Sequence, residues 1–275
     1  MSDIPCVIYR YDGSFVGFLT CVYESFCRRQ VPADIVDGQL EQFFLYPVIE
    51  ITSDEMKAQK LYTSIKKKVS IQAAVYIYHG FLSARFKKEI HLYNLIRKLY
   101  RKGPAFVDAL ADPDAREMHQ ATKALYNEVH SFKEFARFTE TDGALVAVIA
   151  PKNWVLPLLA DHFVNRFNAE TFMIYDETHR QGLVYQEGRW EILPVAALEL
   201  PPLSEGEKYY RKLWRCFREA VTIEARKNLK LQQSHMPKRY WKNMPEMTDQ
   251  VSLKERKNFQ IDSSTRVLSS EDVRQ

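Results

Sequence analysis

Cysteine and long apolar runs are both scarce in this 275-residue chain, and each shortage excludes a class of protein. The four cysteines, Cys6, Cys21, Cys27 and Cys216, are scattered, and no two of them form a CxxC pair. We therefore expect reduced thiols, not a disulfide scaffold, an all-cysteine zinc site or an iron–sulfur cluster. The longest apolar run, residues 144–150, is far too short to cross a bilayer.

Targeting and catalytic motifs are also missing. The first residues lack the basic stretch and apolar stretch of a signal peptide, so the sequence predicts a cytoplasmic protein with no membrane partner. The chain has no GxGxxG, GxxxxGK[ST], HExxH or GxSxG pattern and no helix-hairpin-helix glycines. A standard ATPase, dehydrogenase, zinc protease or serine hydrolase is therefore not expected, and we predict neither a metal nor a cofactor.

The charge of the chain is unevenly distributed, although its net value is only +4. Residues 57–102 contain 12 Lys or Arg and one acid, Glu89, while residues 205–247 contain 11 basic and five acidic side chains. The segments 1–56 and 103–204 carry net charges of −6 and −7. Such alternation attracts a polyanion to particular faces, and a solvated helix surface is the competing explanation.

The order of the expected elements predicts an α+β fold, in which a helical region accompanies a mostly antiparallel sheet with packed helices. Hydrophobic residues make up 46% of the sequence, which is enough to form a core. Strands are expected at 5–10, around 41–51, and at 135–138, 144–150, 171–175, 183–185 and 190–193. Helices are expected after Ser14 and at about 54–68, 71–79, 83–101, 113–132, 154–167 and 205–227.

Three regions follow from these elements. Gly103-Pro104 is a strong helix stop, and it closes an N-terminal strand and helix region, 1–104, that contains basic helices. Residues 105–247 are predicted to form an α+β domain that ends in a basic helix. The polar, serine-rich segment 248–275 is predicted to be disordered.

The last expected helix is amphipathic. At 100° per residue, Tyr210, Leu213, Phe217 and Val221 share one face, with Trp214 at its edge. The opposite side holds a cationic stripe that could follow phosphate groups, or could simply be solvated. The stripe consists of Lys208, Arg211, Arg215, Arg218 and Arg226.

The segment after this helix strengthens the nucleic-acid interpretation. Residues 225–243 contain six Lys or Arg and no acid. Aromatic rings among cations are typical of a surface on which bases stack while phosphates are neutralised. Lys238, Arg239, Tyr240, Trp241 and Lys242 form the predicted clamp. Alternatively, Trp241 anchors the segment to the core.

A secondary basic face is expected on the helix at 83–101. Its apolar residues point inward, and Lys66-Lys67-Lys68 lies nearby in the sequence. Two cationic faces favour contact with a nucleic acid more than one does. The residues of this second face are Lys87, His91, Lys98 and Arg101.

Three side chains are candidates for chemistry. Glu224 is expected near the centre of the apolar face of the last helix, where it would need an arginine partner or a perturbed pKa. Asp176 opens the sequence Asp-Glu-Thr-His-Arg after an apolar strand, which suits proton transfer or a metal, but also an ordinary hairpin turn. His162 lies on a helix one turn before Arg166, where a hydrogen-bonded structural histidine is the alternative.

Five blocks of the sequence resemble a bacterial family of DNA metabolism or DNA repair proteins whose biochemical activity is unknown. The resemblance spans roughly residues 5–247, and its last block is the most distinctive. The blocks are YDGSFVGFLTCVYESF at 11–26, EVHSFKEFARF at 128–138, VLPLLADHFVNRF at 155–167, FMIYDETHRQGLVY at 172–185 and IEARKNLKLQQSHMPKRYWKNMPEM at 223–247.

The resemblance implies a biological context. Members of that family are typically encoded beside a radical-SAM DNA modification or repair protein, and their C-terminal domain also occurs fused to uracil-DNA glycosylase-like domains. No catalytic residue comes with the resemblance. The recurrent polar positions of the family fall here on His130, Arg137, His162, Arg166, Asp176, Arg180, Arg226, Asn228, Arg239 and Trp241.

We therefore expect a DNA-binding accessory protein of DNA repair or metabolism that acts with a radical-SAM partner enzyme. The first alternative is an enzyme that acts on DNA directly through His162, Asp176 and Glu224, which would have to converge on one pocket. The second alternative is a protein–protein scaffold for the partner enzyme. Whether the DNA is single-stranded or double-stranded stays open at this point.

Overall fold

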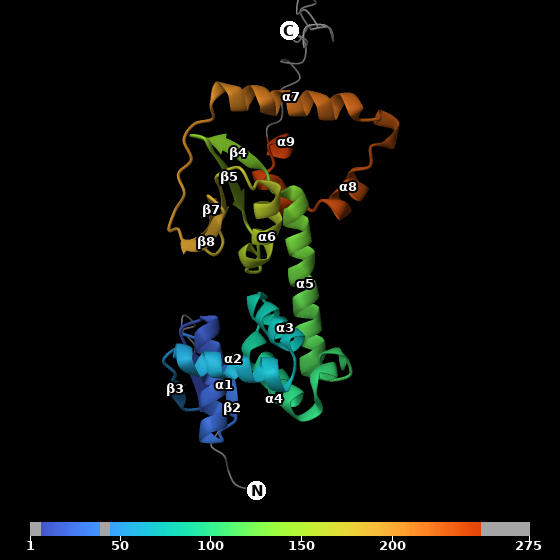
Figure 1. Ribbon diagram of the computed structural model, residues 1–275. Coiled ribbons are helices and arrows are strands. Elements are labelled where there is room, and N and C mark those ends of the chain that lie inside the picture. The colour runs from blue at the N-terminus through green and yellow to red at the C-terminus, as the bar shows by residue number, and fades with distance from the viewer. Residues whose placement is uncertain (1–6, 39–44, 249–275) are drawn as a thin grey trace, which may run out of the picture. The chain divides into compact units, whose positions relative to one another are not determined.

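The computed structural model describes residues 7–38 and 45–248 (Figure 1). Its internal contacts divide the chain into two compact units, Met1–Leu200 (unit 1) and Pro201–Gln275 (unit 2). The predicted domain boundary after residue 104 is not tested by this division and stays a prediction. The predicted disordered segment 248–275 lies, apart from Thr248, outside the described residues.

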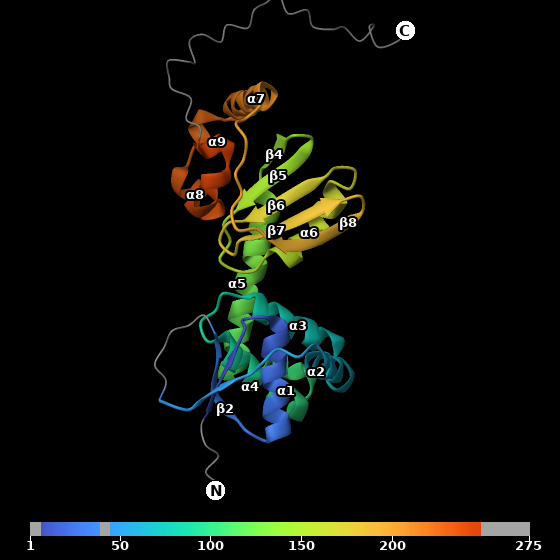
Figure 2. The ribbon, with the colours of Figure 1, turned by 90° about the vertical axis from the view of Figure 1, so that its left-hand side faces the viewer.

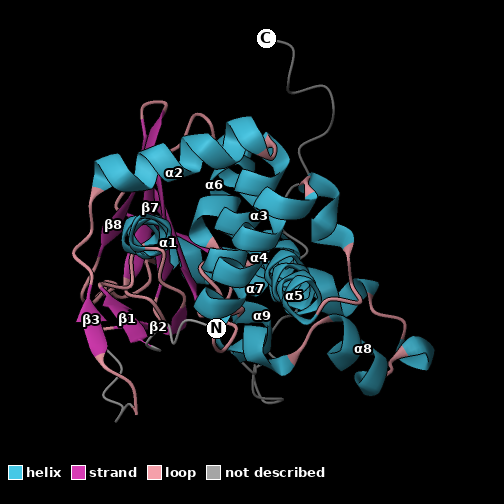
Figure 3. Cartoon of the chain, turned by 90° about the horizontal axis from the view of Figure 1, so that it is seen from below, coloured by secondary structure: helices cyan, strands magenta, loops and turns pink. Residues whose placement is uncertain are grey.

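Unit 1 begins with a strand, a helix and two further strands. β1 (Val7–Tyr11) is the central strand of a three-stranded parallel sheet of order β2-β1-β3, and α1 (Phe15–Arg28) packs against it (Figure 3). The expected cap is confirmed, since Ser14 Oγ accepts a hydrogen bond from the Gly17 amide at 2.9 Å. β2 (Pro32–Asp37) was not expected, and β3 (Val48–Glu50) is shorter than the predicted 41–51 strand; residues 41–44 of that prediction lie outside the described residues.

A helical layer follows, and the predicted helices are present, although the one expected at 83–101 begins at Lys88. Leu92, Leu95, Ile96 and Leu99 of one helix are buried in the main core beside Phe18 of α1. The strong stop at Gly103 is confirmed, because its φ of 85° is one that glycine adopts readily. The helices are α2 (Glu55–Lys68), α3 (Ile71–Leu82), α4 (Lys88–Lys102), the 3-10 turn η1 (Pro104–Asp108) and α5 (Pro113–Phe135).

The second sheet has five strands in sequential order, β4 to β8 (Figure 2). Its neighbours are antiparallel except for β5 and β6, which run parallel and are joined by a helix, so the sheet is mixed and the expectation of a mostly antiparallel sheet holds only in part. Residues 135–138 are not one strand, because α5 continues to Phe135. The elements are β4 (Phe138–Thr141), β5 (Ala144–Ile149), α6 (Leu156–Arg166), β6 (Phe172–Asp176), β7 (Gln181–Gln186) and β8 (Arg189–Pro194).

Unit 2 is helical throughout its described part. The predicted helix 205–227 is shorter than expected, and the chain after it forms short turns and helices instead of continuing. The elements are α7 (Glu205–Val221), η2 (Glu224–Arg226), α8 (Leu229–His235), η3 (Lys238–Asn243) and α9 (Pro245–Thr248).

Candidate nucleic-acid interface

The chain leaves α7 at Val221 and turns back along unit 2. Thr222 is the C-cap of the helix, and its hydroxyl donates a hydrogen bond to the Arg218 carbonyl at 2.5 Å. β-branched Thr222 and Ile223 stand directly after the last turn and adopt extended backbone angles. The sequence predicted that Arg226 continues the cationic stripe of the last helix, and this is wrong, because the helix ends at Val221 and Arg226 lies in η2.

Three arginines of the basic stripe lie on the side of α7 that packs against α9, while Lys208 of the same stripe is exposed. Arg211 and Arg215 are half-buried; Arg211 Nε lies 2.7 Å from Glu207 Oε1, and Arg215 Nε donates to the Arg211 carbonyl at 3.2 Å. Arg218 Nη1 lies 3.7 Å from the Met247 sulfur, and α7 packs against α9. These three arginines are therefore only partly exposed on the side of α7 that packs against α9, and their contact with phosphate stays a prediction.

The apolar side of α7 lies opposite the side that packs against α9 of unit 2. None of the described residues of α7 is buried. The helical period correctly grouped the apolar residues on one side, but it could not say which side the following segment would cover. The exposed residues are Tyr209, Tyr210, Leu213, Trp214, Phe217 and Val221.

The aromatic residues of the predicted clamp are structural in the folded unit. Tyr240 is buried, its hydroxyl accepts a hydrogen bond from Arg239 Nη2, and the Arg239 guanidinium lies 4.6 Å from the ring centroid. Trp241 is half-buried, and its indole N–H donates to the Met236 carbonyl at 3.0 Å. Lys238, Arg239 and Lys242 remain exposed around them.

A basic hollow of about 750 Å³ lies between the end of α7 and the η2–α8 segment. Arg226 is exposed, and its guanidinium has no hydrogen-bond or ion-pair partner within the described part of the chain. Asn228 shapes the wall by capping α8, since its Oδ1 accepts from the Leu231 amide at 3.0 Å. The lining residues are Arg218, Glu219, Thr222, Glu224, Arg226, Lys227, Asn228, Leu229, Leu231, Gln232 and His235.

Glu224 is not the buried carboxylate that the sequence predicted. It lies in η2, beyond the end of α7, with 81% of its side chain exposed, and its Oε1 is 2.6 Å from Lys227 Nζ. The hollow to which it belongs is lined only by residues of unit 2. Its carboxylate is therefore a solvated surface group paired with a lysine, not a buried one paired with an arginine.

Asp176 does belong to a compact polar arrangement, at the end of β6. Its Oδ1 accepts hydrogen bonds from the amides of Thr178 and His179 at 2.9 and 3.0 Å, and its Oδ2 lies 2.6 Å from His179 Nδ1. The ring of Trp154 lies on the His179 ring, with centroids 4.2 Å apart. A carboxylate that orients an imidazole can support proton transfer, but the same contacts also close the β6–β7 turn.

His162 lies in α6 with its Nε2 buried and without a hydrogen-bond partner among the described residues. Burial lowers its pKa, and the nearby charges of Lys133 and Arg166 lower it further. A buried nitrogen with no partner suits a neutral imidazole packed in a helix, where its ring meets the edge of Phe163 at 4.9 Å.

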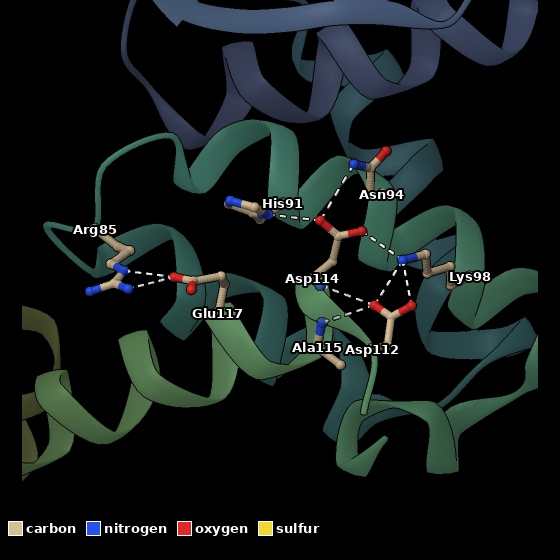
Figure 4. Close-up of polar contacts among 8 residues, drawn as sticks. All are labelled: Arg85, His91, Asn94, Lys98, Asp112, Asp114, Ala115 and Glu117. Carbon is tan, nitrogen blue, oxygen red and sulfur yellow. Dashed lines mark hydrogen bonds and ion pairs between the residues drawn. The ribbon is translucent and has the colours of Figure 1, made fainter. Parts of the chain in front are cut away.

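The secondary basic face of α4 is largely engaged by the start of α5 (Figure 4). Lys98 Nζ lies 2.7 Å from Asp112 and 2.6 Å from Asp114, and His91 Nδ1 lies 2.7 Å from Asp114 Oδ1. Lys87 pairs with Asp34 at 3.1 Å. These ion pairs offset the positive charge of the predicted secondary basic face. Of its four residues, Arg101 is exposed and has no ion pair among the described residues.

Two buried side chains near Trp154 were not singled out from the sequence. Lys88 is 8% exposed; its Nζ donates to the Ser83 carbonyl at 2.9 Å and lies 4.5 Å from the Trp154 ring. Burial lowers the pKa of Lys88, and Glu89 and Asp37 oppose that effect. Glu128 is buried on α5 and accepts the amides of Lys152 and Asn153 at 3.1 and 2.8 Å. Sequence reasoning had no signal for either, because charged residues are expected outside.

Residues 86–246 match a family described as a domain of unknown function, DUF4130. The match runs from just before α4 to α9 and includes the basic hollow, Asp176 and His179. The chain belongs to this family. Comparison with curated proteins finds no match. The DUF4130 description carries no activity, ligand or partner, so it confirms an uncharacterised family and leaves the expected DNA context as a proposal.

No helix in residues 7–38 and 45–248 is both long and apolar enough to cross a membrane. Over the same residues, no three His, Cys, Asp or Glu side chains gather as a metal-binding group.

Proposed function

We propose that this protein binds DNA through the basic hollow of unit 2, as an accessory factor in DNA repair or metabolism. The observation that carries the proposal is the hollow itself, which brings Arg226 and Lys227 of η2 and its flank together with Arg218 and His235. Guanidinium and ammonium groups neutralise phosphates, and amide side chains donate to phosphate oxygens. Asn228 and Gln232 supply such amides in the same wall.

Two further cations belong to the same segment of the chain, although they do not line the hollow. Lys230 and Lys238 are exposed, and neither side chain has a hydrogen-bond or ion-pair partner among residues 7–38 and 45–248. Residues 225–243 contain six Lys or Arg and no acid, so this segment keeps a net positive charge although Glu219 and Glu224 line the hollow and Glu224 pairs with Lys227. Because Arg211 and Arg215 are half-buried and make hydrogen bonds within α7, we assign phosphate contact to Arg226, Lys230 and Lys238, with Arg218 in the wall of the hollow.

The test is fluorescence anisotropy of labelled DNA across a salt series. Arg226→Ala and Lys230→Ala should each weaken binding and reduce the slope of log K against log salt by about one unit. Lys123→Ala is the matched control, because this lysine is exposed on α5 in the acidic part of the chain and should change neither quantity. Binding that does not depend on salt, or that all three variants leave unchanged, would contradict the proposal.

A radical-SAM enzyme is the partner we propose, and this step rests on the sequence resemblance alone. The two proteins should co-purify when DNA is present. If DNA bridges them, nuclease treatment should weaken this co-purification. Co-purification unaffected by nuclease, together with no DNA binding by this chain, would favour the scaffold alternative. The enzyme alternative requires His162, Asp176 and Glu224 to converge on one pocket, and it stays a prediction.

A further inference from the structure

The carboxyl ends of β5 and β6 lie next to each other at one edge of the mixed sheet. These two strands are the parallel pair among the described strands of this sheet, and α6 connects them. Ile149 pairs with Asp176 at the strand ends, and its carbonyl accepts a hydrogen bond from the Glu177 amide at 3.0 Å. The loops 150–155 and 177–180 therefore leave the sheet side by side. Ligands of open sheets bind outside the carboxyl ends of neighbouring parallel strands, so topology favours a site here.

His179, in the second of these loops, is held in one orientation by Asp176. The Asp176 side chain is 1% exposed, and its Oδ2 lies 2.6 Å from His179 Nδ1. Because the other oxygen of this carboxylate accepts two backbone amides, Asp176 acts as an acceptor and the ring proton is assigned to Nδ1. His179 Nε2 has no hydrogen-bond partner among the described residues, and it is not a fully buried atom. One ring nitrogen is therefore left for a ligand.

Trp154, in the first loop, lies against the same imidazole ring. The two ring centroids are 4.2 Å apart, and the Trp154 amide donates a hydrogen bond to the Leu82 carbonyl at 2.9 Å. Lys88 Nζ lies 4.5 Å from the indole centroid. All of these contacts are made within unit 1. The β6–β7 turn requires only that Asp176 accept its amides, so a stacked and oriented imidazole is more than the turn needs.

Two cations without partners belong to the same loops. Lys152 and Arg180 are exposed, and neither side chain has a hydrogen-bond or ion-pair partner in the described part of the chain. Glu177 is the other acid of the second loop and offsets one of these charges, while Asp176 already faces His179. An ammonium group, a guanidinium fork and an imidazole nitrogen together suit a phosphate group, which presents several oxygens to such donors.

The surrounding charge favours a small phosphate ligand over a polymer. Residues 103–204 carry a net charge of −7, which opposes a long polyanion along this part of the chain. A phosphate monoester has a second pKa of about 6, so near neutral pH it can give a proton to an imidazole nitrogen or accept one from it. A phosphodiester has no such proton to exchange. The ligand that matches both the cations and the imidazole is therefore a monoester.

We propose that the carboxyl ends of β5 and β6 form a binding site for a phosphate monoester. His179 Nε2 exchanges a proton with one phosphate oxygen, and Lys152 and Arg180 contact the other oxygens. Asp176 and Trp154 are positioning residues, which fix the imidazole. The site belongs to unit 1, and it does not rest on DNA binding by the hollow of unit 2.

The first measurement is equilibrium dialysis of the full chain with radiolabelled inorganic phosphate. Lys152→Ala and Arg180→Ala should each weaken binding by about fivefold to 30-fold, because each removes a charged hydrogen bond. Lys123→Ala on α5 is the matched control and should leave binding unchanged. Phosphate binding that neither of the first two variants weakens would overturn the site.

Competition identifies the source of the phosphate. Thymidine 5′-monophosphate should displace the label, and so should an oligonucleotide with a 5′-phosphate if the site takes strand ends as well as mononucleotides. The same oligonucleotide without its terminal phosphate should not displace the label. Equal displacement with and without the terminal phosphate would show that the site binds a diester, and the monoester assignment would be wrong.

The imidazole is tested in the unaltered chain. Diethyl pyrocarbonate should modify His179, and inorganic phosphate should protect it. In ¹⁵N NMR of protein with labelled histidine, the ring proton should lie on Nδ1, and phosphate should shift the Nε2 signal. An unreactive His179 would show that Nε2 is covered, and an Nε2 signal that phosphate does not move would show that the ring does not meet the ligand. Either result would overturn the proposal.

Asp176→Asn separates the orientation of the imidazole from the closing of the turn. Asparagine keeps an oxygen for the amides of Thr178 and His179, but its side-chain N–H group would face His179 Nδ1. The ring proton should therefore move to Nε2, which the same ¹⁵N signals report. An unchanged tautomer would mean that Asp176 only closes the turn and does not orient the ring.

Discussion

Lys98 Nζ lies 2.6 Å from Asp114 Oδ2, and this ion pair joins the middle of α4 to the first turn of α5 (Figure 4). Lys98 also reaches Asp112, whose Oδ1 caps α5 by accepting the amides of Asp114 and Ala115 at 3.0 and 3.3 Å. One ammonium group thus serves two carboxylates at a helix N-terminus, where negative charge is itself favourable.

Lys98→Ala should destabilise the protein by about 1–3 kcal/mol, because half-buried Asp112 and buried Asp114 would lose their cation. Arg101→Ala on the same helix is the control and should stay within about 0.5 kcal/mol. Urea unfolding of both variants measures the difference. Equal stabilities would mean that water replaces the ammonium group at no cost.

The same network predicts a response to acid. Burial alone would raise the pKa of Asp112 and Asp114, but hydrogen bonds from Lys98 outweigh it and the pKa of both carboxyls is lowered. This stabilisation is present above the unfolded aspartate pKa of about 3.9 and is lost as the pH falls through the lower folded value. Lys98→Ala should therefore unfold over a higher pH range than the wild type in an acid titration followed by circular dichroism.

Glu128→Gln should lower the free energy of unfolding by about 1.5–3 kcal/mol. The buried carboxylate of Glu128 accepts hydrogen bonds from the Lys152 and Asn153 amides and from Asn153 Nδ2 at 2.5 Å. The side-chain N–H groups of a glutamine would face these donors and could not accept from them. Glu134→Gln changes an exposed carboxyl on the same helix and should be nearly neutral. Thermal unfolding of the pair tests whether Glu128 holds the β5–α6 loop; an unchanged midpoint for Glu128→Gln would argue that it does not.

Gly17→Ala should destabilise unit 1 by about 1–3 kcal/mol or prevent folding. A Cβ at residue 17 would lie 2.3 Å from Asp12 Oδ1, 2.6 Å from Ser53 Oγ and 2.9 Å from the Tyr11 ring. Gly206→Ala on α7 meets nothing closer than 3.9 Å and should be neutral or slightly stabilising, since alanine favours a helix. Similar unfolding midpoints for the two variants would show that the contacts around Gly17 relax freely.

His162→Leu should gain stability relative to the wild type as the pH falls. Because burial and the charges of Lys133 and Arg166 lower the folded pKa of His162, its contribution is present above the unfolded pKa of about 6.5 and is lost below it. Leucine does not titrate, so the difference between the two proteins should shift in favour of the variant between pH 7.5 and 5.5. Urea unfolding at each pH measures it. A difference independent of pH would place His162 in a solvated site.

The local elements were predictable from the sequence because their signals are short-range. Ser14 as a cap, Gly103 as a stop and the turn at Glu187-Gly188 each act within a few residues, and all three are in place. β2 was missed, since Pro32 and the two aspartates of PADIVD resemble a loop and only pairing with β1 makes the segment a strand. The parallel β5–β6 pair depends on the same kind of remote pairing.

The sequence by itself determined the amphipathic α7, the basic closing segment and membership of an uncharacterised family, because helical period, charge and sequence blocks belong to the chain alone. Only the tertiary structure decided which side of α7 packs against α9, that Tyr240 is buried, and that Glu224 is exposed beyond the helix end. These outcomes depend on where η3 and α9 fold back, and the free energy of that packing comes from contacts between residues far apart in the chain.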